Sequence, residues 1–396
     1  MNSPRRVVLL GSTGSIGTQT ADVVRRNPGR FALVALSAGG SQPQLLARQA
    51  SDFGVSTIGV PSDEAARALH EQLRAVGRSD VHLVVGPDAS DRLAALDADV
   101  VLNAVAGAQG LRATIAALDA GRTVALANKE SLIAGGSLVI DRARPGQLIP
   151  VDSEHSAIAQ CLRGGTADEV RKLVITASGG PFRGRSRAEM ADVTPVQALA
   201  HPTWNMGQLI TTNSATLINK GLEMIEAHLL FGVAYDQIEV VVHPQSIVHS
   251  MVEFNDGATL AQASPPDMRL PIALALGWPD RVPDAVRPLD LTAAQTWQFD
   301  PLDVTAFPSV ELAREAGRAG GLAPAVYNAA NEAMVEQFHA GRIGFLDIVD
   351  TVGTILREWL SNRPLAADKA GTVEDVEAAD DWARDRARTV VGIPTR

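Results

Sequence analysis

The amino-acid sequence predicts an α/β protein with an N-terminal doubly wound parallel sheet, a central α+β domain and a C-terminal bundle of helices. Three observations predict this order. A short apolar run leads directly into a glycine-rich turn and a helical segment, Asp256-Gly257 marks a hairpin, and helical apolar spacing begins near residue 310. We divide the chain into residues 1–150, a central domain over 151–276, a linker over 277–308 and a helical domain over 309–396.

The strands and helices of the first domain follow from its alternating pattern. Val7-Val8-Leu9-Leu10 is a β-branched and apolar run, as in a buried parallel strand. A glycine turn follows at once, and a helix is expected over residues 18–26. Strands that alternate with helices are typical of a doubly wound parallel sheet. The remaining strands are expected at residues 31–36, 55–60, 81–85, 100–103, 123–127 and 148–151.

The pattern changes beyond residue 152. Strands are expected at 172–176, 238–242, 249–255 and 259–263, with helices at 156–163 and 216–231. The segment 277–308 is rich in proline and has little periodicity, which is typical of a linker. Helices are expected at 310–319, 324–340, 345–360 and 373–390, with Asn328, Asn331 and Glu332 on exposed helix faces.

Composition limits the class of protein. The 396 residues exceed one ordinary core, and 46% hydrophobic with 20% charged residues is typical of soluble globular proteins. A net charge of −10 argues against nucleic acid or an anionic membrane as a partner. Cys161 is the only cysteine, so a disulfide framework is excluded. Because no apolar run approaches the roughly 20 residues that span a bilayer, we expect a cytoplasmic protein without a membrane partner.

Two carboxylates, Asp152 and Glu154, stand two residues apart where the chain reads as extended. In a strand such side chains share one face. Neighbouring carboxylates repel unless a proton or a cation neutralises them, and Mg²⁺ prefers oxygen ligands. The pair alone is more often a solvated strand end, so the metal-site hypothesis depends on the other motifs.

The turn Gly11-x-x-Gly14-x-x-Gly17 predicts a dinucleotide site in a Rossmann-like domain. Glycines after a strand let backbone N–H groups approach a pyrophosphate at the N-terminus of the next helix. A plain tight turn is the alternative. NAD enzymes tend to carry an acidic residue at the end of the second strand, whereas this chain has residues 37–41 as Ser-Ala-Gly-Gly-Ser, which favours NADP.

Three further motifs suit an anionic substrate. Lys129, after a strand, could hold an anion or an oxyanion, or form a surface ion pair with Glu130. The turn at Ser178-Gly179-Gly180 could cradle a phosphate or be a simple turn. The segment His201–Gly207 has the character of a lid, although ordinary loops share it.

Helical spacing brings Asn219, Lys220 and Glu223 to one side of a helix. An internal salt bridge is one interpretation. A third carboxylate beside phosphate-binding groups is the other. His155, His243 and His249 have no ligand spacing and are expected to be structural.

Seven motifs occur in order along the chain, namely GSTGSIG, ANKESL, PVDSEHSAI, ASGGPF, HPTWNMG, SATLINKGLEMIEA and HPQSIVHSMVEF. Together they resemble the 1-deoxy-D-xylulose 5-phosphate reductoisomerase family, from the first strand to the terminal helices. The resemblance implies an NADPH-dependent enzyme with Mg²⁺ or Mn²⁺, and Co²⁺ as a further option. It implies conversion of 1-deoxy-D-xylulose 5-phosphate, a small phosphorylated sugar, to 2-C-methyl-D-erythritol 4-phosphate by retro-aldol and aldol steps and hydride reduction, in the non-mevalonate isoprenoid pathway. It also implies a homodimer.

The resemblance carries residue roles onto this chain. Residues 1–150 become the NADPH-binding domain and 151–276 the catalytic domain, with a flap at about residues 198–208. The metal ligands are Asp152, Glu154 and Glu223, and the catalytic residues are Lys129, Glu154 and His201. The substrate-binding residues are Ser153, Glu154, Ser178, His201, Trp204, Ser214, Asn219, Lys220 and Glu223. The cofactor-binding residues are Gly11, Thr13, Gly14, Ser15, Ile16, Ser37, Gly39, Gly40, Ser41, Ala106, Asn128, Lys129, Glu130, Met206 and Gly207.

One departure concerns the cofactor. Many relatives carry a basic residue and Asn where this chain has Gly40 and Ser41. The NADP 2′-phosphate is then assigned to Ser37, Ser41 or backbone donors. Two alternatives remain on residues alone: a simple NADP-dependent dehydrogenase of another small phosphorylated aldehyde, and a nucleotide-sensing regulatory protein.

Overall fold

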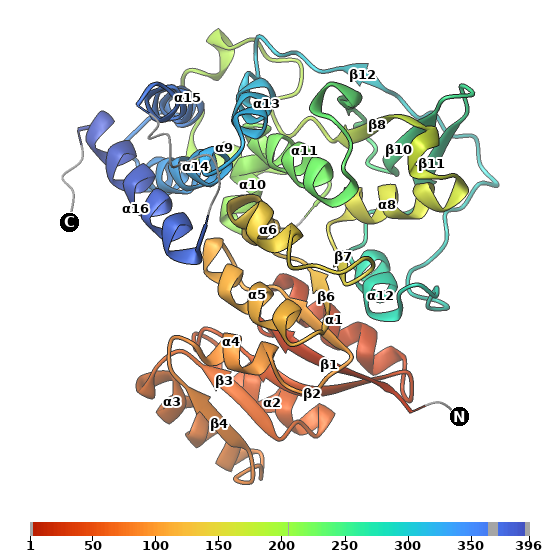
Figure 1. The fold of residues 1–396 in the computed structure, drawn as a ribbon, viewed down its shortest axis with the longest axis vertical. Helices are drawn as coiled ribbons and strands as arrows, with labels where there is room; N and C mark the ends of the chain where they lie inside the picture. Colours follow the sequence, from red (N-terminus) through yellow and green to blue (C-terminus); the bar gives the residue numbers. More distant parts are fainter. Residues whose placement is uncertain (1–2, 205, 363–370, 393–396) are drawn as a thin grey trace. The chain divides into compact units, whose positions relative to one another are not determined.

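Seven parallel strands form the N-terminal sheet in the order β4-β3-β2-β1-β5-β6-β7 (Figure 1). The order runs outward from the neighbours β1 and β5, which places the topological switch point between them. The strands are β1 Arg5–Leu10, β2 Phe31–Ser37, β3 Thr57–Val60, β4 His82–Val85, β5 Val100–Asn103, β6 Thr123–Leu126 and β7 Leu148–Pro150. The doubly wound parallel sheet is therefore confirmed, with strand ends that differ from the prediction by at most two residues.

The structure, a computed structural model, describes residues 3–204, 206–362 and 371–392. They fall into two units. The first unit comprises Met1–Ser131, Asp141–Ser156 and Asp267–Arg287, and the second comprises Leu132–Ile140, Ala157–Pro266 and Pro288–Arg396. The division into four segments made from the sequence stays a prediction.

Helices connect the strands of the first sheet, and the first three of them contribute residues to its apolar core. They are α1 Ser15–Arg26, α2 Pro43–Phe53, α3 Asp63–Ala75, α4 Ala89–Ala94, α5 Leu111–Asp119, α6 Lys129–Gly135 and α7 Ser137–Ile140. A distant helix, α12 Arg269–Gly277, joins the first unit. Its Ile272 and Leu276 are fully buried in the same core as Leu9 and Leu36. Burial of apolar surface therefore holds α12, although it comes late in the sequence, against the core of the N-terminal sheet.

The second unit contains a mixed sheet of five strands in the order β11-β10-β8-β9-β12. Only β8 and β9 pair in parallel. The hairpin expected at Asp256-Gly257 joins β10 to β11 and is confirmed. The strands are β8 Val170–Ala177, β9 Ile238–Val242, β10 Val248–Phe254, β11 Thr259–Ala263 and β12 Asp300–Pro301, the last within the predicted linker.

The helical C-terminal region is also confirmed (Figure 1). Helix α14 lies against α10, α13, α15 and α16, so little of its surface reaches solvent. The expectation of exposed polar faces is therefore wrong for Asn328 and Asn331, which are 1% and 0% exposed. The helices of the second unit include α9 Pro195–Ala198, α10 Gln208–Ala215, α11 Ile218–Phe231, α13 Ser309–Ala319, α14 Ala323–His339, α15 Phe345–Ser361 and α16 Val373–Val390.

Two local predictions need correction. The expected helix 216–231 begins two residues later, as α11 at Ile218, because Leu217 takes a left-handed φ of 57° and separates α11 from α10. The chain at Asp152 and Glu154 is not an extended strand, because β7 ends at Pro150 and helix α8, Ser153–Cys161, begins at once. Glu154 therefore stands in the first turn of a helix rather than on one face of a strand with Asp152.

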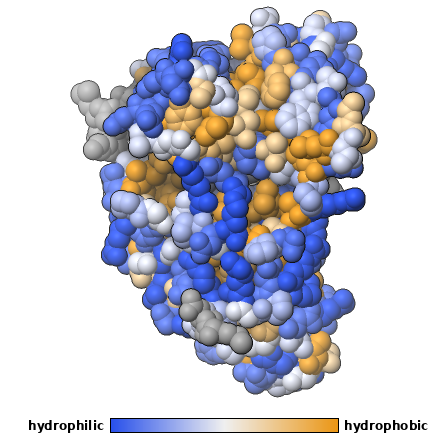
Figure 2. Space-filling model, turned by 90° about the vertical axis from the view of Figure 1, so that its right-hand side faces the viewer, coloured by the Kyte–Doolittle hydropathy of each residue, from blue (hydrophilic) through white to orange (hydrophobic). Residues whose placement is uncertain are grey.

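The face of the molecule in Figure 2 carries hydrophobic residues in patches separated by hydrophilic ones. Among the described residues, no helix has both the length and the apolar character needed to cross a bilayer.

Candidate functional site

The glycine turn between β1 and α1 is held by its own backbone. The N–H groups of Gly11 and Ser12 both donate to the Ser37 carbonyl, at 2.9 and 2.8 Å. Gly11 has a φ of +78°, and a Cβ there would lie 2.4 Å from the Ala104 carbonyl oxygen. Gly14 precedes α1 as its N-cap, and the first turn of α1 holds no acidic residue. The positive end of the helix therefore meets a turn with no side chain at positions 11 and 14, where an anion can approach the backbone.

The region after β2 disfavours a side chain at position 40. Gly40 has a φ of +90°, and a Cβ there would lie 2.6 Å from the Ala65 Cβ. Ser37 is 2% exposed, and its hydroxyl lies 3.0 Å from that of Ser90. Ser41 is exposed. Of the two predicted serines, Ser41 is thus the one that reaches solvent.

Asn128 holds the loop that follows β5. Its amide donates to the carbonyls of Val105 and Gly107, the latter at 2.8 Å. Its Oδ1 accepts from the Ser131 N–H at 2.7 Å and from the Ser131 hydroxyl at 2.6 Å. Since Asn128 is 2% exposed and makes four bonds, it positions the loop that presents Ala106.

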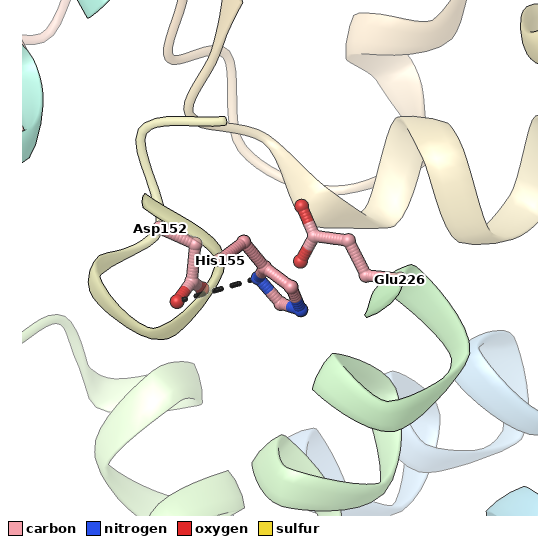
Figure 3. Close-up of side chains that lie close together, drawn as sticks. All are labelled: Asp152, His155 and Glu226. Carbon is pink, nitrogen blue, oxygen red and sulfur yellow. Dashed lines mark ion pairs between the residues drawn. The ribbon is translucent and has the colours of Figure 1, made fainter. Parts of the chain in front are cut away.

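Asp152 lies beside two basic groups of its own unit. Lys129 Nζ forms an ion pair with Asp152 Oδ2, with side chains 11% and 14% exposed. His155 Nδ1 lies 3.7 Å from Asp152 Oδ1, and a dashed line marks this pair in Figure 3. Burial alone would raise the pKa of the Asp152 carboxyl, but Lys129 and then His155 hold it well below its usual range. Asp152 is therefore ionised at neutral pH, and the partner found for Lys129 is a half-buried carboxylate of the predicted site.

Ser153 and Glu154 open helix α8. The Glu154 N–H donates to Asp152 Oδ1 at 3.3 Å, and the Ser153 hydroxyl donates to Glu154 Oε2 at 2.5 Å. Asp152 thus caps the turn that carries Glu154. The two carboxylates belong to one local hydrogen-bonded segment although the strand expected there is absent.

The predicted phosphate-binding residues lie on the second unit. Lys220 Nζ donates to Glu223 Oε2 at 2.6 Å, and Asn219 Nδ2 donates to Glu223 Oε1 at 2.5 Å. Lys220 is 5% exposed and Glu223 is 1% exposed, so the internal salt bridge exists and is buried. A Cβ on Gly180 would lie 2.8 Å from the Ser214 carbonyl oxygen, so the turn after Ser178 lies directly against helix α10.

His201 connects the lid segment to this turn. Its Nδ1 accepts from the N–H groups of Thr203 and Trp204, at 3.1 and 2.9 Å. Burial, and then the charge of Lys220, lower the pKa of His201 to about 4. The ring is therefore neutral with its proton on Nε2, which donates to Ser178 Oγ at 3.1 Å.

The rest of the lid segment is only partly described, since Asn205 lies outside the described residues. The Trp204 ring is tilted against His249, with centroids 6.2 Å apart. The Met206 carbonyl accepts from the Thr211 hydroxyl at 3.2 Å, and Gly207 caps α10.

The structural role expected for His243 is confirmed. Its Nε2 accepts from the N–H groups of Ile247 and Val248, both at 3.1 Å, and its Nδ1 lies 2.8 Å from the Gln298 carbonyl oxygen. Both ring nitrogens therefore serve the backbone.

Two residues near this site were not singled out from the sequence. Arg183 and Arg185 line a cavity together with Ser178. The available signal was their position, because they closely follow the turn Ser178-Gly179-Gly180.

Several described carboxylates could hold a metal ion, among them Asp152, Glu154 and Glu223. Asp152 and Glu154 belong to the first unit and Glu223 to the second. Their donor atoms are all carboxylate oxygens, which suit Mg²⁺.

Comparison with known proteins identifies the family. Three family models match: 1-deoxy-D-xylulose 5-phosphate reductoisomerase at residues 7–136, its C-terminal domain at 148–231, and the DXP reductoisomerase C-terminal domain at 263–386. The 1-deoxy-D-xylulose 5-phosphate reductoisomerase of Pseudarthrobacter chlorophenolicus is 61% identical over 389 residues, 97% of each chain.

Solved structures agree. The enzyme of this name from Zymomonas mobilis, in complex with NADPH, is 43% identical with a TM-score of 0.90, over 98% of this chain and 100% of that one. A DOX-P reductoisomerase in complex with NADPH, fosmidomycin and magnesium is 37% identical with a TM-score of 0.90, over 98% of each chain. The chain therefore belongs to the 1-deoxy-D-xylulose 5-phosphate reductoisomerase family.

Proposed function

We propose that this chain is the NADPH- and magnesium-dependent reductoisomerase that converts 1-deoxy-D-xylulose 5-phosphate to 2-C-methyl-D-erythritol 4-phosphate in the non-mevalonate isoprenoid pathway. The observation that carries the proposal is the presence of two features in the same chain. One is a glycine turn of the dinucleotide-binding kind, and the other is a set of buried or half-buried carboxylates suited to a hard cation. A relative at 61% identity over 97% of both chains carries this name. Plain hydride transfer would need no such carboxylates.

Asp152, Glu154 and Glu223 are the proposed metal ligands. The ionised state of Asp152, maintained by Lys129 and His155, leaves a carboxylate without a proton to displace. When bound there, the metal would act as a Lewis acid toward the substrate's carbonyl and hydroxyl oxygens. Magnesium is the metal in a solved relative. Manganese and cobalt remain further options.

The phosphate group of the substrate is assigned to Ser178, Ser214, Asn219 and Lys220. Ser178 Oγ accepts hydrogen bonds from the Gly180 N–H at 3.2 Å and from His201 Nε2 at 3.1 Å. Since both of these bonds are accepted, the hydroxyl's own proton remains to be donated to a phosphate oxygen. Lys220 supplies positive charge beside it, and the neutral His201 orients the serine.

Lys129, Ser153, His201 and Trp204 complete the proposed substrate contacts. Lys129 is positioned by Asp152 and would meet negative charge that develops on the substrate oxygens. Trp204 would close over the substrate and exclude water. NADPH would supply the hydride.

NADPH is assigned to the glycine turn Gly11–Ile16, to the loop at Ala106 and to Met206 and Gly207. Asn128 would act by holding that loop, with Lys129 and Glu130 next to it. The exposed Ser41 and the backbone at Gly39 and Gly40 are the proposed donors to the 2′-phosphate, with Ser37 behind them.

Homodimer formation and a cytoplasmic location are part of the same proposal. The family resemblance carries the first. Sedimentation of the purified protein would test the first.

The experiment that tests the proposed function is NADPH oxidation with 1-deoxy-D-xylulose 5-phosphate and Mg²⁺, followed by NMR of the product. A branched product carbon skeleton is expected. Oxidation with an unbranched product would favour the simple dehydrogenase, and no oxidation by folded protein would overturn the proposal.

A further inference from the structure

A cavity of about 430 Å³ opens beside the turn that carries Ser178. Its lining includes Ser178, Phe182, Arg183, Arg185 and Pro202, all from the second unit. Ser178 is also a proposed ligand of the substrate phosphate. The cavity and the phosphate site therefore share a wall.

Aromatic packing supports one side of this cavity. Phe182 is 2% exposed and packs edge-to-face against Phe345 with ring centroids 5.1 Å apart. The Arg185 guanidinium carbon lies 5.5 Å from the Phe182 ring centroid, within the range of a cation–π contact. The Arg183 side chain is close to the glycine turn, because a Cβ on Gly179 would lie 3.0 Å from its Cγ and Cδ.

Within the described part of the chain, neither Arg183 nor Arg185 forms an ion pair, whereas their neighbour Arg187 pairs with Asp350. The charge of Arg185 still helps to lower the pKa of the Glu189 carboxyl. The acid nearest in sequence, Glu189, accepts from the Ser186 N–H and hydroxyl at 2.8 and 2.7 Å. Two positive charges therefore face a cavity that leads to a phosphate-binding hydroxyl.

We propose that Arg183 and Arg185 form an outer anion subsite that takes a phosphomonoester and passes it to the phosphate site at Ser178. The inference rests on the proposed function for the identity of the substrate, since a sugar phosphate carries such a group. Electrostatic attraction of this kind raises the rate of encounter and weakens as salt screens the charges. The subsite therefore contributes to capture of substrate and not to the chemical steps.

The kinetic test uses R183Q, R185Q and the double variant, with R187Q as the matched control. R187Q removes the same charge from the same loop, but that charge is already paired. At about 0.01 M salt we expect kcat/KM to fall about fivefold for each lost charge, with kcat unchanged, because one charge at close range in water is worth about that factor. At about 0.15 M salt the difference should shrink. Equal kcat/KM in the wild type and the double variant, or an equal loss in R187Q, would overturn the proposal.

A second measurement separates this subsite from the proposed function. In a calorimetric titration of the complete chain at low salt, inorganic phosphate should occupy two sites in the wild type and in R187Q, and one in the double variant. If the wild type binds phosphate at two sites but does not turn over the sugar phosphate, the proposed function is wrong and the outer subsite is supported. The same single site in all three proteins would remove the subsite.

Discussion

Substitution of Gly11 by Ala, compared with a control glycine, should separate two costs of a side chain at this position. One is the cost of the positive φ, and the other is the cost of the steric clash. The backbone φ of +78° costs an L-residue about 1–2 kcal/mol. The new Cβ would also lie 2.4 Å from the Ala104 oxygen and 2.7 Å from its carbonyl carbon, which is overpacking worth about 1–3 kcal/mol more. We expect the free energy of unfolding to fall by about 2–5 kcal/mol in total.

Gly29→Ala is the matched control. Its φ is +81°, and nothing lies within 4 Å of its Cβ position, so only the backbone cost of about 1–2 kcal/mol applies. Urea denaturation of both variants measures the difference. NADPH fluorescence titration should show at least about tenfold weaker binding for Gly11→Ala, since a shift worth about 1.4 kcal/mol at the turn is enough. Equal losses of stability in both variants, with unchanged NADPH binding, would refute the reasoning.

Three further predictions concern the lid and the cofactor pocket. His201 has a pKa of about 4 in the folded chain and about 6.5 when unfolded, so the unfolded state takes up a proton first as the pH falls. Stability should therefore decrease from about pH 6.5 to about pH 4, and His201→Asn should flatten this dependence in urea unfolding; parallel curves would contradict it. Trp204→Ala should raise KM for the sugar phosphate several-fold while the NADPH affinity stays unchanged, and an equal loss of both would assign Trp204 to the fold. Gly40→Arg should lower the free energy of unfolding by about 2–5 kcal/mol without tightening NADPH, because its φ of +90° costs about 1–2 kcal/mol and its Cβ, 2.6 Å from the Ala65 Cβ, adds about 1–3 kcal/mol; tighter binding would show that the pocket accepts a basic side chain.

The sequence predicted the elements whose patterns are local. Val7–Leu10 with its glycine turn, the strand at Val100–Asn103 and the hairpin at Asp256-Gly257 all formed where expected, because apolar runs and turn residues act over a few positions. The parallel arrangement of the strands followed from their alternation with helices.

The features that the sequence did not predict depend on tertiary packing. Asn331 looked like an exposed helix residue, yet it is fully buried and donates to Asn213 at 3.0 Å, because neighbouring helices cover α14. No local sequence pattern predicts that Asn331 pairs with Asn213, because the two residues are 118 positions apart in the sequence. The partner of Lys129 was missed for a similar reason, since Asp152 approaches it from a different strand end.

Chemistry at the candidate site was predicted by residue type more than by geometry. Asp152 and Glu154 were singled out as an extended pair, but the turn into α8 arranges them instead. His201 was placed in a lid by its motif, while its neutral state and its bond to Ser178 depend on burial and on backbone N–H groups. Those are properties of the folded chain.

The most direct measurement is the Mg²⁺ dependence of NADPH oxidation with 1-deoxy-D-xylulose 5-phosphate, in the wild type and in Glu223→Gln. The wild type should turn over only with the divalent ion. The variant should keep its NADPH affinity and lose turnover by roughly 100-fold or more, because a neutral amide is a poor ligand for a hard cation. Wild-type activity in a chelator, or full metal-dependent activity in Glu223→Gln, would contradict the account.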